Sequence, residues 1–236
     1  IRQKDRGIGG DKLWRMYKEN FGEEHSVGYN RFYDIIEKHN LKVRKKKRRA
    51  RTTDSNHDLP LYPNLIRELI PLRPNQLWVS DITYIPIEDA SSRLGYRFCF
   101  LTLVMDAYSK RVLGHNVAAT LEAEYSIRAL KMALGTLPDG FDDTLIHHSD
   151  RGCQYASADY IKQLMSHRVV PSMTEGGNPK DNAMAERINS TIKNELLHGK
   201  TFTSLRQVKE AVDKAILFYN MERPHSSLDW HTPEHS

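Results

Sequence analysis

Three acidic residues occupy positions where a carboxylate is more plausible as a catalytic or metal-binding group than as a structural one. Asp81 lies inside an alternating, β-rich segment at 77–86, although Asp is disfavoured within strands. Asp150 closes a second short strand-like segment, and Glu186 lies on a predicted helix that follows a glycine-rich turn. If the three side chains converge, their oxygens suit hard divalent cations, Mg²⁺ first and Mn²⁺ second. Carboxylates alone would then indicate metal-dependent phosphoryl transfer.

The helix that carries Glu186 offers further polar groups. Asn189, Ser190 and Lys193 follow Glu186 at spacings of three, four and seven residues, which places all four on one helix face. A metal held by Glu186 beside a DNA phosphate held by Lys193 would need this arrangement, so we predict that Asn189, Ser190 and Lys193 contact DNA. The simpler alternative is a solvated helix face with ordinary charges. The opposite face is an apolar stripe made of Ala185, Ile188, Ile192 and Leu196.

Two adjacent histidines precede Asp150. His147 and His148 point to opposite faces of a strand, so paired ligation of one metal ion is unfavourable. Strand alternation puts His148 on the face of Asp150, where we expect it to contact DNA or to support the site. We expect His147 to pack in the core, and Cys153 to be a small packing residue.

The elements that must position these residues alternate between strand and helix patterns. Strands are predicted at 77–86, 96–106, 111–118 and 144–150, and helices at 120–137, 157–168, 181–197 and 204–220. Three strands, a helix, a fourth strand and further helices describe an α/β layer fold.

The positive charge is concentrated in the first quarter of the chain. Residues 1–59 hold 16 Lys/Arg against 9 Asp/Glu, a balance of +7, whereas the remainder holds 19 against 21. Residues 1–41 suggest two short helices, which are either a helix-turn-helix-like DNA reader or a plain helical hairpin. Residues 42–76 are a basic stretch followed by a proline-rich linker. The basic stretch suits either nucleic acid or a solvated linker. Its candidate DNA contacts are Arg44, Lys45, Lys46, Lys47, Arg48, Arg49 and Arg51.

The remaining composition is that of an ordinary globular protein. No apolar run reaches transmembrane length, and only two cysteines are present among 236 residues, which argues against a disulfide framework. We therefore expect a cytoplasmic protein with no membrane partner. Because the chain begins with Ile1 rather than Met, the lack of a signal peptide excludes little.

The spacing of the acidic residues resembles a known signature. Sixty-eight residues separate Asp81 from Asp150 and 35 separate Asp150 from Glu186. This pattern, with the words "WVSDITY", "HHSDRGCQY" and "GNPKDNAMAERINSTIKNE", resembles the retroviral-integrase-like DDE transposases. The ending "YNMERPHSSLDWHTP" is similar to the tail of bacterial insertion-sequence transposases of family three. Within it, Arg223 and His225 either contact DNA or pin the last helix.

The resemblance implies a fold and a reaction. It implies a ribonuclease-H-like catalytic core at 77–236, with a mixed sheet and flanking helices, preceded by a small helical DNA-binding region. It also implies that two Mg²⁺ ions, bridged by Asp81, support the cutting of element ends and their joining to target DNA. The partners implied are element-end DNA, target DNA and further copies of the chain, as a dimer or larger assembly on the bacterial nucleoid. Two alternatives are a nuclease of the same fold that cuts without joining, and a catalytically idle DNA-binding protein.

Overall fold

The computed structural model describes residues 13–14, 17–18, 21–22, 24–41, 57–175, 182–223 and 225–236. Contacts divide the chain into two compact units, residues 1–49 and 50–236. In the first unit, helix α2 (Tyr29–Lys38) buries Phe32 and Ile36 against Leu13. The seven basic residues predicted to contact DNA, which fall within 44–51, lie outside the described residues.

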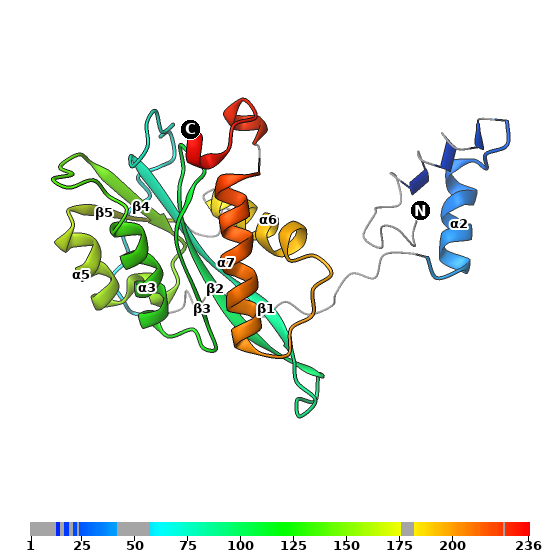
Figure 1. Ribbon diagram of the computed structural model, residues 1–236, viewed down its shortest axis with the longest axis horizontal. Helices are drawn as coiled ribbons and strands as arrows, with labels where there is room; N and C mark the ends of the chain where they lie inside the picture. The colour runs from blue at the N-terminus through cyan, green and yellow to red at the C-terminus, as the bar shows by residue number, and fades with distance from the viewer. Residues whose placement is uncertain are drawn as a thin grey trace. The chain divides into compact units, whose positions relative to one another are not determined.

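The second unit is built on one mixed five-stranded sheet (Figure 1). Its strands are β1 (Leu77–Glu88), β2 (Tyr96–Asp106), β3 (Val112–Ala118), β4 (Leu145–Ser149) and β5 (Val169–Met173). The order across the sheet is β3-β2-β1-β4-β5. The pairs β1/β2 and β2/β3 are antiparallel, whereas β1/β4 and β4/β5 are parallel. Strand β1 is therefore central, with an antiparallel neighbour on one side and a parallel neighbour on the other.

Helices cover both faces of this sheet (Figure 1). Helices α3 (Ala123–Leu134), α4 (Cys153–Ala156) and α5 (Ala158–Ser166) pack against one face, in a core that includes Trp78 and Leu145. Helices α6 (Ala183–Thr191) and α7 (Leu205–Met221) pack against the other, in a core that includes Val79. The alternation along β1 thus sends neighbouring residues into different cores, because successive strand residues point to opposite faces.

Strand β5 and the end of α6 differ from the sequence-based expectation. β5 was not predicted, since its five residues include Pro171, a residue tolerated in a sheet mainly at an edge. The helix predicted at 181–197 is α-helical only over α6 and continues as a π-helical turn, η2 (Ile192–Leu196). Such turns insert a residue into the helical repeat and often occur near functional sites.

A close approach of strand to helix explains one glycine. At Gly114 in β3, a Cβ atom would lie 2.1 Å from the backbone oxygen of Ala129 and 2.9 Å from the backbone nitrogen of Ala133, both in α3. No side chain fits in that space, so the absence of a Cβ is what lets α3 lie directly on the sheet.

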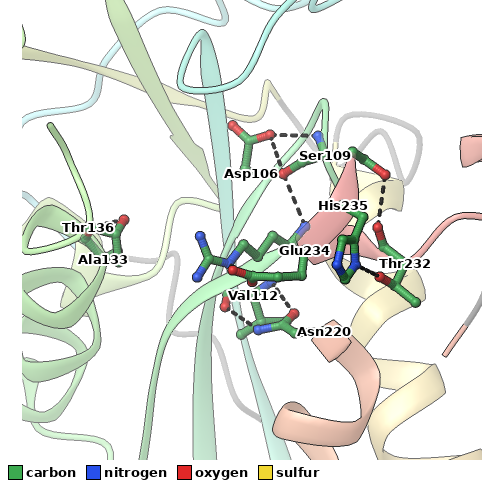
Figure 2. Close-up of polar contacts among 11 residues, drawn as sticks. Asp106, Ser109, Val112, Ala133, Thr136, Asn220, Thr232, Glu234 and His235 are labelled. Carbon is green, nitrogen blue, oxygen red and sulfur yellow. Dashed lines mark hydrogen bonds and ion pairs between the residues drawn. The ribbon is translucent and has the colours of Figure 1, made fainter. Parts of the chain in front are cut away.

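The turn between β2 and β3 and the C-terminal tail are tied together by polar contacts (Figure 2). Asn220 of α7 bridges the backbone of Val112, accepting from its N–H and donating to its carbonyl, each at 2.9 Å. Arg111 pairs with Glu234 at 2.7 Å, between the turn and the 3-10 turn η4 (Pro233–His235). These contacts fix the last helix and the tail against the end of the sheet. No helix within the described ranges is both long and apolar enough to cross a membrane.

Candidate active site

The pairing of β1 with β4 brings Asp81 and Asp150 side by side. In this parallel pair Leu77 lies opposite Ile146 and Val79 lies opposite His148. Extending the same register by two residues places Asp81 opposite Asp150, immediately after the last residue of β4. Because side chains repeat every second residue, both carboxylates project from the sheet face of Val79, which α6 covers.

The surroundings of Asp81 disfavour the ionised form of its carboxyl. Its side chain is half-buried, and the pKa of its carboxyl is raised from 3.8 to about 7. Burial is the main cause, and the negative charges of Asp150 and, less strongly, Glu186 add to it. A hydrogen bond from Asn189 acts in the opposite direction. The three carboxylates are thus close enough for their charges to repel, which is a situation that a cation relieves.

Asn189 holds the carboxylate of Asp81 in place. Its Nδ2 donates to Asp81 Oδ2 at 2.8 Å, and its side chain is buried, with 4% of its surface exposed. The packing of α6 on β1 turns this amide inward, toward Asp81, and a contact between Asn189 and DNA stays a prediction. Asn182, at the start of the same helix, donates to the backbone oxygen of Ser80 at 3.4 Å and ties α6 to β1.

The turn after β4 orients Asp150. The backbone N–H of Gly152 donates to Asp150 Oδ1 at 2.9 Å. Arg151 then anchors the turn on both sides. Its Nε donates to the backbone oxygen of Thr174 at 2.6 Å, and its own backbone oxygen lies 2.9 Å from His57 Nε2. The second carboxylate is consequently fixed by its own turn and by a segment that precedes the sheet.

Glu186 lies at the exposed side of the same centre. It belongs to the first turn of α6 and is exposed to solvent. Within the described part of the chain, no three His, Cys, Asp or Glu side chains are placed closely enough to hold a metal ion. The donor set nevertheless suits a hard cation. Besides the carboxylates, the buried Oδ1 of Asn189 accepts no hydrogen bond from any described residue, so another oxygen ligand lies beside Asp81.

Comparison with known proteins places this core in a family. Residues 71–179 and 167–233 each match the family described as "Integrase core domain". The 31 kDa protein of insertion element IS600 from Shigella sonnei is 34% identical over 206 residues, which are 86% of this chain and 72% of that protein. The chain belongs to the insertion-sequence transposases with an integrase core.

Further comparisons agree with this family and with its fold. The transposase of insertion sequence element IS629, also from Shigella sonnei, is 32% identical over 187 residues. These cover 79% of this transposase chain, which spans 59% of the length of that relative. Among solved structures, the catalytic core domain of HTLV-2 integrase in complex with magnesium superposes with a TM-score of 0.51. The match has 21% identity and covers 69% of this chain and 96% of that one. The expected fold is confirmed: the transposase core is ribonuclease-H-like.

The two histidines of the transposase are both interior. His147 is buried, its Nε2 lies 3.0 Å from Tyr160 Oη, and burial, with His148 beside it, lowers the pKa of His147 to about 3. His148 has none of its surface exposed, and its Nδ1 lies 2.9 Å from the hydroxyl of Ser172 in β5. The expectation that His148 contacts DNA or supports the site stays a prediction, and its burial favours the supporting role.

Ser190 and Lys193 lie further along α6 and η2. Ser190 is exposed, and its hydroxyl accepts a hydrogen bond from Asn194 at 3.0 Å. Lys193 is half-buried, with its Nζ 3.5 Å from the centre of the Tyr84 ring of β1. The pairing with Tyr84 was not predicted, since it depends on the π-helical turn that redirects Lys193 toward the sheet.

Proposed function

We propose that this transposase cuts the ends of its element and joins them to target DNA at a centre formed by Asp81, Asp150 and Glu186. The observation that carries the proposal is the parallel pairing of β1 with β4, which sets Asp81 beside Asp150 on the sheet face that α6 covers. The raised pKa of Asp81, whose causes include the charges of both other carboxylates, supports it. Groups in a functional site are often perturbed in this way. Cutting and joining are both attacks on a phosphodiester, so a single centre serves both reactions.

The same residues would hold divalent cations, Mg²⁺ or Mn²⁺. Asp81 would be shared between two ions, with Asp150 and Glu186 each completing one of the two sites. When bound, such ions supply Lewis-acid stabilisation of the attacking and leaving oxygens of an in-line displacement. The protein contributes the positions: Asn189 fixes Oδ2 of Asp81, and the Gly152 N–H fixes Oδ1 of Asp150. Exposed Glu186 stands where DNA can approach.

DNA would be held by positive charge around this centre and in the N-terminal unit. Ser190 and Lys193 lie on the same helical segment as Glu186, and we assign them to contacts with the DNA backbone. The helical region at 1–41 and the basic stretch within 42–76 would add phosphate contacts, which give a salt-dependent affinity. Because two element ends must be held together, the working form would be a dimer or a larger assembly.

A strand-joining assay tests the proposal. The substrate is element-end DNA with Mg²⁺, and cutting and joining are scored as separate products. Glu186→Gln is expected to abolish both reactions while DNA binding is retained, because the substitution removes a metal ligand but leaves α6 packed. Glu124→Gln removes an exposed carboxylate from α3 and serves as the matched control.

The outcomes separate the proposal from its alternatives. Joining by Glu186→Gln at the wild-type rate would refute the assignment of the third carboxylate. Cutting without joining by the wild-type protein would identify a nuclease, and DNA binding with neither reaction would identify an idle binding protein.

A further inference from the structure

A basic cavity lies at α6 and α7, and it shares helix α6 with the proposed centre. Its volume is about 340 Å³, enough for a single nucleotide but not for a duplex. It is enclosed by α6, α7, the β2–β3 turn and the C-terminal tail. Among the described residues that line it, none is acidic, and the positive or titratable ones are Lys110, Arg187, Arg223 and His225.

Lys110 brings a half-buried positive charge to this cavity. Its half-buried ammonium donates to the backbone oxygen of Ala107 and lies 3.7 Å from Met184 Sδ. The neighbouring carboxylate of Asp106 is occupied by other donors: it accepts from Asn75 N–H at 2.8 Å and from Ser109 N–H at 2.7 Å. Burial lowers the pKa of Lys110 and the charge of Arg187 adds to this effect, whereas the negative charge of Asp106 acts in the opposite direction. An anion in the cavity would stabilise this ammonium.

The two arginines of the cavity differ in their partners. Arg223 forms a two-pronged pair with Glu195, at 2.8 and 3.0 Å, so its charge is largely balanced. It also lies 3.2 Å from His225 Nε2, which must accept, since a guanidinium has no acceptor. For Arg187, no ion pair is found within the described ranges of the chain. Arg187 and Lys110 therefore provide the net positive charge, and a phosphate suits two such cations.

An aromatic ring stands at the rim of the same cavity. Trp230 is 71% exposed, and its backbone has φ of +67°, directly after Asp229 at +49°. Two consecutive non-glycine residues in the left-handed region are strained, and strain of this kind gathers at functional sites. The loop is closed by hydrogen bonds from Trp230 N–H to the His225 carbonyl at 2.9 Å and from His225 N–H to the His231 carbonyl at 3.0 Å. The tail thus holds a large apolar ring open to solvent.

We propose that this cavity binds one unpaired nucleotide of a DNA strand, with its phosphate between Lys110 and Arg187 and its base stacked on Trp230. The inference rests on the proposed function, since the strand is the one that reaches Glu186 on the same helix. An α-helix with its side chains is roughly 10 Å across, so the nucleotide would be a near neighbour of the reacting phosphate. Stacking on aromatic rings and neutralisation by basic groups are the usual means of holding single strands.

The test uses the full chain and a fluorescein-labelled single-stranded oligodeoxynucleotide of about 12 nucleotides. Binding is measured by anisotropy in EDTA, so that the proposed metal site is not involved, and over a series of salt concentrations. Trp230→Ala is expected to weaken binding about tenfold, whereas Trp230→Phe retains most of the affinity. Lys110→Met and Arg187→Gln should each weaken binding and reduce the salt slope by about 0.7. Arg128→Gln, on α3 at the other sheet face, is the matched control.

An oligonucleotide with abasic sites separates the two contacts. Trp230→Ala should then have no effect, while Lys110→Met should still weaken binding. Wild-type affinity in folded Trp230→Ala and Lys110→Met variants would overturn the proposal, as would no measurable binding by the wild-type protein. Strand joining is scored separately. Normal joining by the wild-type protein, with unaffected binding by the variants, would refute the nucleotide site but not the proposed reaction. Weakened binding by the variants, with no joining by the wild-type protein, would refute the proposed reaction but not the nucleotide site.

Discussion

Replacing Asp81 with Asn should stabilise the protein in the absence of metal. The folded pKa of Asp81 is raised to about 7 from 3.8, so the folded state resists losing this proton. Stability from this group is therefore complete at low pH and is lost as the pH rises from about 4 through about 7. The introduced amide keeps an oxygen that can accept from Asn189 but carries no charge, so the variant escapes this loss.

The expected gain follows from the size of the shift. A difference of about three pKa units corresponds to about 4 kcal/mol at pH 8, at about 1.4 kcal/mol per unit. Since Asp81 is half-buried rather than enclosed, solvent screening reduces the gain to about 2–4 kcal/mol. For a unit of this size, each kcal/mol raises Tm by about 2–4 °C, which gives a shift on the order of 10 °C. At pH 5 the gain should be less than half as large.

Thermal melting followed by circular dichroism in EDTA measures this effect at pH 5 and pH 8. Asp139→Asn, which neutralises an exposed loop carboxylate, is the control and should leave Tm within about 1 °C. Added Mg²⁺ should raise the Tm of the wild-type protein more than that of Asp81→Asn, since a bound cation stabilises only the site that holds it. An unchanged or lower Tm for a natively folded Asp81→Asn variant at pH 8 would refute the reasoning.

Two further predictions concern the packing of helices on the two faces of the sheet. Asn189→Leu removes the hydrogen bond that lowers the pKa of Asp81. The acidic limb of the profile of cleavage rate against pH should therefore move to higher pH by about one unit. The control Asn194→Leu, at an exposed position, should not move it. An unshifted profile for Asn189→Leu would exclude this positioning role. Gly114→Ala drives a Cβ into the backbone of α3 and should cost about 3 kcal/mol in urea unfolding, whereas Gly135→Ala meets only ordinary contacts at 3.5 Å. Equal midpoints for these two glycine variants would contradict the described approach of strand and helix.

Much of the fold could be predicted from the sequence because the central strands carry strong patterns. The apolar run at 96–106 became β2 with the same bounds, since a strand buried on both faces needs little else to define it. The edge strand β5 was missed because Pro171 interrupts a pattern of only five residues. Its existence depends on pairing with β4, which is a contact that local sequence does not encode.

For the site, as for the fold, local sequence predicts which residues take part but not how the elements pack around them. The positions of Asp81, Asp150 and Glu186 on predicted strands and a helix, together with the resemblance to the DDE transposases, picked out three residues whose charges meet at Asp81 in the structure. The burial of Asn189 and His148 could not be predicted, because helix-face and strand-face periodicity indicate which side of an element a residue lies on, not how deeply it is buried. The depth of burial depends on how closely α6 packs on the sheet and on the pairing of β5 with β4, and both depend on the whole core.

The central position of β1 determines when the three carboxylates can come together during synthesis and folding. Asp81 meets Asp150 only through the parallel pairing of β1 with β4, and Asp150 is synthesised 69 residues after Asp81. Glu186 follows after another 36 residues. Contacts between such distant segments form late in folding, because the loops between them must close first. A chain interrupted before residue 186 contains at most two of the three carboxylates. If these carboxylates form the cutting centre that we propose, the chain acquires that centre only when its fold is nearly complete.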